Sequence, residues 1–153
     1  MPSSFESSNL HYNSWLLLQQ TCNLVLRCEA RVFAGKGLTP QKHAILMAIK
    51  YIEDPVTPTE VAHWLDRSTN SISLIIDRMV KNGLVKRIRN LKDRRSVRLS
   101  ITEKGNELLS QTKTSGWELI EHMLSPLSED ELLLLDDMLQ RVRKKAYEYI
   151  NSK

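Results

Sequence analysis

A change of periodicity near residue 84 constrains this chain more than any other feature. Before it, apolar residues recur every three to four positions, as they do in amphipathic helices. From Val97 to Ile101 they alternate strictly with polar residues, which is typical of a half-buried strand. Leu84 to Ile88 is the expected partner strand, and the polar stretch from Arg89 to Ser96 is the expected loop. The sequence therefore predicts one β-hairpin in an otherwise helical chain.

Capping residues divide the remaining sequence into six helices. Thr39-Pro40 and Thr57-Pro58 each place a capping hydroxyl before a proline at the first helical position, where its missing N–H costs nothing. The expected helices run from Leu10 to Phe33, from Thr39-Pro40 to the break at Asp54-Pro55, from Thr57-Pro58 to about Leu65, from Ser68 to Asn82-Gly83, from Thr102 to Met123, and from Ser128 to Ile150. The expected core contacts of the second helix are Ala44, Ile45, Met47, Ala48 and Tyr51.

The resulting order is α-α-α-α-β-β-α-α. Two short helices joined by a tight turn and followed by a hairpin describe a winged helix-turn-helix, in which the second short helix reads the major groove of DNA. One long helix precedes this unit and two follow it. The predicted fold class is mainly α with a small β-hairpin wing.

The distribution of charge favours a polyanionic partner. The net charge is +4, but residues 38–105 hold 13 Lys and Arg against 7 Asp and Glu. Residues 78–98 hold nine basic side chains and one acidic side chain. A basic centre between mildly acidic flanks is typical of nucleic-acid binding, and an ordinary solvated basic surface is the alternative.

Other classes of function find no support in the sequence. There is no glycine-rich phosphate loop, nucleophile elbow or HExxH motif, so we do not expect an enzyme. The two cysteines and four histidines are scattered, and neither a metal nor a cofactor is expected. The polar N-terminus lacks the features of a secretory signal, and no apolar run is long enough to span a membrane, so a cytoplasmic location without membrane contact is expected.

The fourth helix has the composition of a DNA-recognition helix. Short polar residues crowd its N-terminal end, where free N–H groups also favour phosphate. They are Ser68, Thr69, Asn70, Ser71 and Ser73. Asn pairs well with adenine, and Ser or Thr serves many base edges. A core helix with an ordinary polar cap is the alternative interpretation.

The hairpin loop carries the sequence Lys92-Asp93-Arg94-Arg95. An arginine on a projecting loop can enter an A·T-rich minor groove, where the negative potential is enhanced. Asp93 can hold Arg95 extended through a charge-assisted hydrogen bond, or it can serve only as a turn residue. The basic tip favours contact with DNA over contact with another protein.

Six short segments, taken in their order along the chain, resemble the MarR (multiple antibiotic resistance regulator) family, and the resemblance covers about residues 10–150. The matching segments are Leu38-Thr39-Pro40-Gln41, Thr59-Glu60-Val61-Ala62, Asp77-Arg78-Met79, Gly83-Leu84-Val85-Lys86-Arg87, Asp93-Arg94-Arg95 and Leu99-Ser100-Ile101-Thr102-Glu103-Lys104-Gly105. The resemblance implies a transcriptional regulator that binds a palindromic double-stranded DNA operator as a homodimer. Because most members of the family repress transcription, repression is expected. The chain would then comprise a dimerisation helix (1–37), a DNA-binding domain (38–101) and C-terminal dimerisation helices (102–153).

The resemblance also implies roles for single residues. Residues 69–74 would face the major groove and Arg95 would be the minor-groove arginine, with Asp93 orienting it. The other basic residues expected on the wing are Arg87, Arg89, Lys92 and Arg94. The resemblance implies that Pro40, Gln41 and Lys42 lie near the phosphate backbone, and we also expect Arg67 and Arg78 there.

The sequence departs from the family pattern at two positions. Where the family commonly has Thr-Arg on the recognition helix, this chain has Ser73-Leu74, so a candidate guanine contact is lost and Leu74 can meet a thymine methyl instead. Arg67 stands where an apolar residue is usual, directly before the helix cap, and can reach phosphate.

Two further features bear on partners. The last helix carries a continuous apolar stripe, which either a second subunit or intramolecular packing can cover. The residues of this stripe are Leu132, Leu135, Met138, Leu139, Val142, Ala146, Tyr149 and Ile150.

The resemblance also implies a cavity for a small aromatic or phenolic effector, or an oxidant-sensing cysteine such as Cys22 or Cys28. The candidate cavity residues are Trp15, Cys22, His43, Met47 and Tyr51, and their alternative role is ordinary core packing with an inert thiol.

Overall fold

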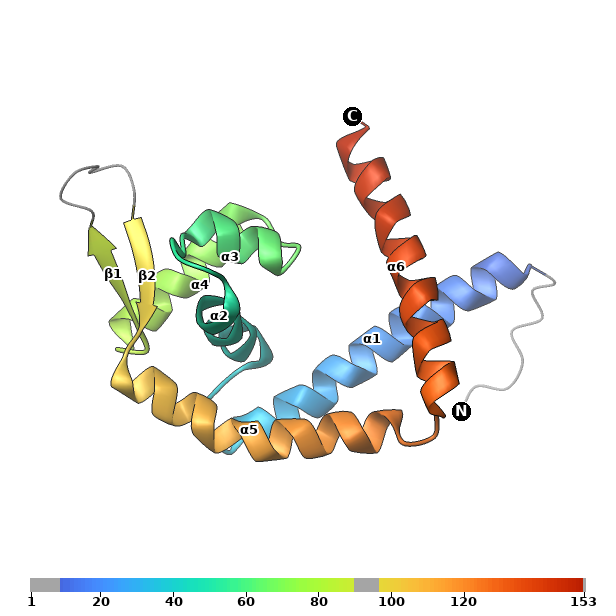
Figure 1. Ribbon diagram of the computed structural model, residues 1–153, viewed down its shortest axis with the longest axis horizontal. Coiled ribbons are helices and arrows are strands. Elements are labelled where there is room, and N and C mark those ends of the chain that lie inside the picture. Colours follow the sequence, from blue (N-terminus) through green and yellow to red (C-terminus); the bar gives the residue numbers. More distant parts are fainter. Residues whose placement is uncertain (1–8, 90–96, 153) are drawn as a thin grey trace. The chain divides into compact units, whose positions relative to one another are not determined.

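The order of elements matches the predicted order. The computed structural model describes residues 9–89 and 97–152, with the backbone alone at residue 89, and the chain divides after Gly116 into two compact units. The elements are α1 (Leu10–Ala34), α2 (Pro40–Tyr51), α3 (Pro58–Trp64), α4 (Thr69–Lys81), β1 (Val85–Arg89), β2 (Val97–Ile101), α5 (Glu103–Leu124) and α6 (Glu129–Asn151) (Figure 1). The mainly helical class with one hairpin is therefore confirmed.

The predicted caps account for where the helices begin. The Thr39 hydroxyl accepts a hydrogen bond from the Lys42 amide at 3.3 Å, so it satisfies a donor that the first turn of α2 leaves free. At α3, Thr57 and Glu60 form a full capping box, in which the Glu60 carboxylate accepts from the Thr57 amide at 2.7 Å. Ser128 and Glu131 form the same box at α6, and these bonds to Ser128 lower the pKa of Glu131.

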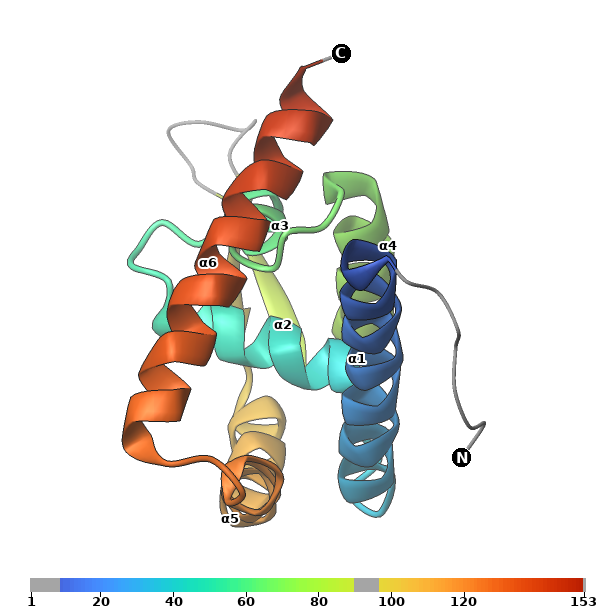
Figure 2. The same cartoon turned by 90° about the vertical axis from the view of Figure 1, so that its right-hand side faces the viewer.

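The core of the first unit lies among α2, α3, α4 and the hairpin. These elements contact one another, and α2 also contacts α1 (Figure 2). The largest fully buried apolar side chains are Ile45, Leu46, Val61, Ile76, Met79 and Val85. One core assignment was wrong, because Tyr51 is 62% exposed. It is the last residue of α2 and lies on the side of the helix away from Ile45 and Ile49.

The hairpin begins one residue later than the alternation predicts. β1 pairs antiparallel with β2 in a register that joins Val85 to Ile101 and Arg89 to Val97, so Arg89 belongs to the strand and not to the loop. Leu84 is buried, but its amide donates to the Met79 carbonyl at 2.9 Å and completes the end of α4. An apolar residue that ends a helix cannot be distinguished from the first residue of a strand by periodicity alone.

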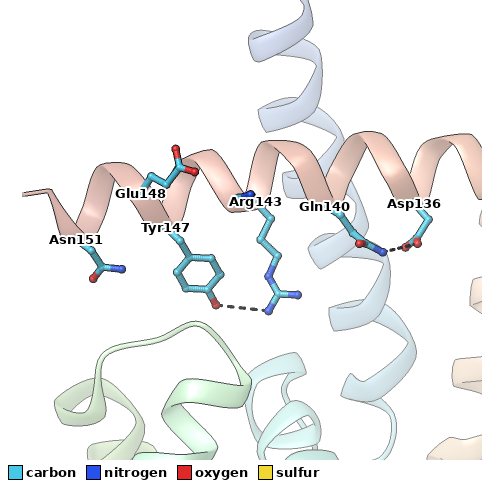
Figure 3. Close-up of a pocket in the computed structure, with 7 residues that line it drawn as sticks. Asp136, Gln140, Arg143, Tyr147, Glu148 and Asn151 are labelled. Carbon is cyan, nitrogen blue, oxygen red and sulfur yellow. Dashed lines mark hydrogen bonds between the residues drawn. The ribbon is translucent and has the colours of Figure 1, made fainter.

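In the second unit, α6 leaves its apolar stripe uncovered. No residue of α6 is buried, although Leu132 and Leu135 are half-buried. The exposed apolar residues of this helix include Leu133, Leu134, Met138, Leu139, Val142, Tyr149 and Ile150. A polar face carries bonds within the helix, such as the Gln140 amide donating to the Asp136 carboxylate at 2.6 Å and Arg143 to the Tyr147 hydroxyl at 3.5 Å (Figure 3). The helix is thus amphipathic, and several of its polar side chains are paired with one another.

Candidate nucleic-acid interface

The recognition helix α4 has one buried face and one outward face. Ile72, Ile76 and Met79 are buried and seat the helix on the core. Of the residues predicted to meet the major groove, Ser68, Thr69, Asn70, Ser71 and Leu74 are exposed, and Ser73 is half-buried. The predicted set therefore lies at the surface, clustered in the first two turns.

Ser68 has a structural duty that limits its part in binding. Its hydroxyl oxygen accepts from the Ser71 amide at 3.3 Å, and the hydroxyl also lies 2.8 Å from the Ser71 hydroxyl. This is the N-cap of α4 that the sequence predicted. Asn70 and Leu74 lie four residues apart on the outward face, followed one turn later by Arg78.

A tight turn between α3 and α4 fixes the start of the recognition helix. Asp66 has a left-handed φ of 53°, and its amide donates to the His63 carbonyl, while the Arg67 amide donates to the Ala62 carbonyl. These two bonds are those of a Schellman motif, and Asp tolerates the left-handed conformation better than most residues. The turn places Arg67 and Ser68 directly at the entrance to α4.

Three predicted DNA-contacting residues converge beside this turn. Gln41 from α2, Arg67 from the turn and Ser71 from α4 line one shallow depression of about 120 Å³. Its remaining lining is mostly apolar and consists of Ala44, Leu65, Ile72 and Ile75. The other two residues predicted near phosphate at the start of α2, Pro40 and Lys42, are half-buried. Polar groups from separate elements thus gather at one end of the recognition helix.

An ion pair ties the recognition helix to the hairpin. Arg87 on β1 lies 2.8 Å from the Asp77 carboxylate on α4, with both side chains partly exposed. Arg87, predicted as a DNA contact on the wing, therefore has an intramolecular partner, whereas Arg78 is exposed at the end of α4. Asp77 was not among the residues predicted for the site. Its signal was a lone carboxylate directly before a basic run.

The hairpin is also attached at its other strand. Arg98 lies 3.3 Å from the Asp54 carboxylate, and the Leu99 amide donates to the Val56 carbonyl at 2.8 Å. The predicted tip residues Lys92, Asp93, Arg94 and Arg95 lie outside the described residues. Arg89, which leads toward the tip, pairs with Val97 through its backbone.

The first turn of α5 is bonded to the end of the recognition helix. The Thr102 hydroxyl donates to the Gly83 carbonyl at 2.6 Å and accepts from the Gly105 amide at 3.1 Å. The Lys104 ammonium donates to the Asn82 carbonyl at 3.1 Å. Gly105 packs so closely that a Cβ there would overlap the Leu84 carbonyl oxygen. We name the residues 82–84 and 102–105 the α4–α5 junction.

The predicted cavity residues are separated by their exposure. His43 is half-buried and stacks on Phe33 with ring centroids 4.2 Å apart, and burial lowers the pKa of His43. Met47 is half-buried, but Trp15, Cys22 and Tyr51 are exposed. The alternative in which Trp15 and Cys22 are core residues is wrong for the single chain. Their helical spacing identifies one face of α1, and no described residue of the first unit buries that face.

Two features are absent from residues 9–89 and 97–152, the part of the chain that the structure describes. Within these ranges, no group of three His, Cys, Asp or Glu side chains is arranged to hold a metal ion. No helix in the same ranges has the length and apolar content needed to cross a membrane.

Comparisons with known proteins point to one family. The profile of the MarR family matches residues 36–96. The transcriptional regulator MhqR of Bacillus subtilis is 30% identical over 115 residues, which cover 75% of this chain and 79% of MhqR. The solved structure of the organohalide-sensing regulator RdhR bound to 2,4-dichlorophenol has a TM-score of 0.86 at 23% identity, covering 97% of this chain and 88% of RdhR. A mutant of MarR from Escherichia coli complexed with operator DNA has a TM-score of 0.71 at 24% identity, covering 88% of this chain and 99% of MarR.

These likenesses agree with the observed fold. The solved structures share the fold, and the relative MhqR is a helix-turn-helix transcriptional regulator. The chain belongs to the MarR family of winged helix-turn-helix DNA-binding transcriptional regulators.

Proposed function

We propose that this chain is a homodimeric repressor that binds a palindromic operator and is released by a small aromatic or phenolic ligand. The observation that carries the proposal is the outward face of α4. Short polar side chains occupy its N-terminal end, and three predicted DNA-contacting residues converge beside it at Gln41, Arg67 and Ser71. This arrangement suits a helix that enters the major groove with its N-terminal residues toward the bases.

Contacts to the DNA backbone would orient the recognition helix. Gln41 and Lys42 lie in the first turn of α2, where the helix dipole favours phosphate. Arg67 and Arg78 lie near opposite ends of α4 and would reach phosphates on either side of the groove. The wing tip would place Arg95 in the minor groove, with Asp93 holding it extended.

Dimerisation is proposed from the uncovered apolar surface of the terminal helices. On α1, exposed large apolar residues include Leu10, Trp15, Leu17, Leu24 and Leu26. On α6, the whole stripe is exposed or half-buried. Continuous apolar surface on this scale marks an interface, because monomeric proteins rarely leave it open to water. A two-fold dimer binds two equal half-sites, and a palindromic operator follows from that symmetry.

The proposed effector site lies next to α2 and α1. The half-buried His43 ring, stacked on the buried Phe33, and the half-buried Met47 on the same helix as His43 would form one wall of a site for a planar ligand. The structural neighbour RdhR, bound to a chlorinated phenol, supports an aromatic ligand class. A repressor of this kind acts on genomic DNA, so the proposal includes the cytoplasmic location.

The decisive test is operator binding by Arg95→Ala. Duplexes are recovered from random fragments by wild-type protein and used as probes in gel shifts over a range of salt concentrations. We expect a loss of affinity of at least about fivefold at an unchanged melting temperature, since contacts of this kind contribute roughly 1–3 kcal/mol. Arg141→Ala removes the same charge from α6 and is expected to leave affinity unchanged. Equal affinity of Arg95→Ala and wild type would contradict the role of the wing.

Three further measurements test the dimer, the role of Asp93 and repression separately. Light scattering at micromolar concentration is expected to give the mass of two chains, and the mass of one chain would exclude the dimer. Asp93→Ala is expected to weaken binding although it removes a negative charge near DNA. Tighter binding by Asp93→Ala would mean that this carboxylate only repels phosphate. A reporter gene placed behind the recovered operator is expected to be silenced, and activation would refute repression.

A further inference from the structure

An exposed leucine stands at the centre of the outward face of α4. Leu74 is 62% exposed, and within α4 it is the only large apolar side chain that is exposed. At 3.6 residues per turn it lies opposite the buried row formed by Ile72, Ile76 and Met79. Leu74 therefore contributes little to the core of this chain.

The neighbours of Leu74 on this face are polar or charged. Asn70 precedes it by one turn, and Asp77 and Arg78 follow it by one turn, all of them exposed. A single exposed leucine on a protein surface is ordinary. Leu74, however, lies in the middle of the face that the proposed function turns toward the bases. A leucine at such a place is unusual, because the groove would desolvate it.

The major groove offers one apolar group to such a side chain. It is the C5-methyl group of thymine, since the other base edges there present hydrogen-bond donors and acceptors. We infer that Leu74 packs against a pyrimidine C5-methyl group in each operator half-site and makes the chain select a methylated pyrimidine at that position. This inference rests on the proposed function, and it names the chemistry that this helix reads.

The same side chain would discriminate against other bases. Leucine has no hydrogen-bonding group, so a guanine or cytosine edge beneath it would lose water without gaining a partner. The contact is specific to the methyl group and not to thymine as such. 5-Methylcytosine carries the same methyl group, so the inference predicts that cytosine methylation at this position strengthens binding.

The test compares bases that differ by the methyl group alone. In the duplex selected by wild-type protein, each thymine is replaced by deoxyuridine in both half-sites, and affinity is measured by fluorescence anisotropy. Burying one methyl group corresponds to about a fourfold change in affinity. We expect one position at which the double replacement weakens wild-type binding by about fifteenfold, and at which 5-methylcytosine binds more tightly than cytosine.

Two variants identify the residue responsible. In Leu74→Ala, deoxyuridine and thymine are expected to bind equally at that position, and the exposed location of Leu74 leaves the fold intact. Arg78→Ala is the matched control one turn away, because loss of a phosphate contact lowers both affinities and preserves their ratio. A thymine-to-deoxyuridine ratio that persists in Leu74→Ala, or that equals one throughout in wild type, overturns the inference while DNA binding itself stands. Failure of wild-type protein to select any duplex would instead refute the proposed function, and the inference with it.

Discussion

Replacing Gly105 with alanine tests whether close packing at the α4–α5 junction holds the recognition helix in place. A Cβ at this position would overlap the Leu84 carbonyl oxygen and lie 2.7 Å from the Ile101 Cγ2. The oxygen belongs to the backbone, which accepts the Thr102 amide at 3.1 Å, so it cannot move without disturbing the turn after α4. Gly105 is buried, and no open space is available on its side.

Two opposing contributions set the size of the effect. Overpacking of this kind costs about 1–3 kcal/mol, and the better helix propensity of alanine returns up to about 1 kcal/mol. We expect a net loss of about 1–2 kcal/mol in the free energy of unfolding, or a melting temperature lower by roughly 2–8 °C for a chain of this size. Urea denaturation at a single protein concentration measures it, because dimerisation would make stability depend on concentration.

Gly116 in the same helix provides the matched control. A Cβ there would lie 3.8 Å from the Phe33 ring, which is ordinary contact. Gly116→Ala is therefore expected to stabilise the protein by up to about 1 kcal/mol through helix propensity alone. The two glycine-to-alanine changes should shift stability in opposite directions. If Gly105→Ala is as stable as wild type, close packing does not explain the glycine.

Three further results are expected. Burial lowers the pKa of His43, so the unfolded chain binds more protons than the folded chain at and below the ordinary value of 6.5, and stability should fall as pH drops through that value. In His43→Gln, the free energy of unfolding measured in urea at several pH values should depend less on pH. An unchanged slope would contradict this. Thr102→Val keeps the shape but removes both hydrogen bonds of the hydroxyl, and should cost about 1–2 kcal/mol by thermal melting; no loss would mean that water replaces them. Asp77→Asn breaks a partly exposed ion pair with Arg87, so it should cost less than about 1 kcal/mol in unfolding yet weaken operator binding in gel shifts, and unchanged affinity would show that the pair does not position the wing.

Local signals in the sequence were sufficient for the elements of the fold. Thr39, Thr57, Ser68 and Ser128 each cap the helix that the sequence assigned to them. Capping depends on residues three positions apart, so it can be read without knowledge of the tertiary structure. The exposed polar end of α4 followed in the same way from its composition and helical period.

Contacts between distant residues were beyond the sequence alone. Nothing in the spacing of Asp77 and Arg87 shows that a turn brings them to 2.8 Å. The convergence of Gln41 and Arg67 depends on how α2 packs against the turn before α4. Periodicity likewise identified the face of α1 that carries Trp15, but it could not show whether that face is buried by the same chain or left for a partner.

The α4–α5 junction makes the recognition helix and the first turn of α5 a single mechanical piece. Thr102 and Lys104 donate hydrogen bonds to the carbonyl groups that directly follow α4. Because Gly105 has no side chain, the first turn of α5 packs closely against this segment. A rotation of α5 about its own axis would then rotate α4 with it. In the proposed dimer, the distance between the two recognition helices would be set by the orientations of the two α5 helices. The number of base pairs between operator half-sites would therefore depend on residues of α5 that touch no DNA.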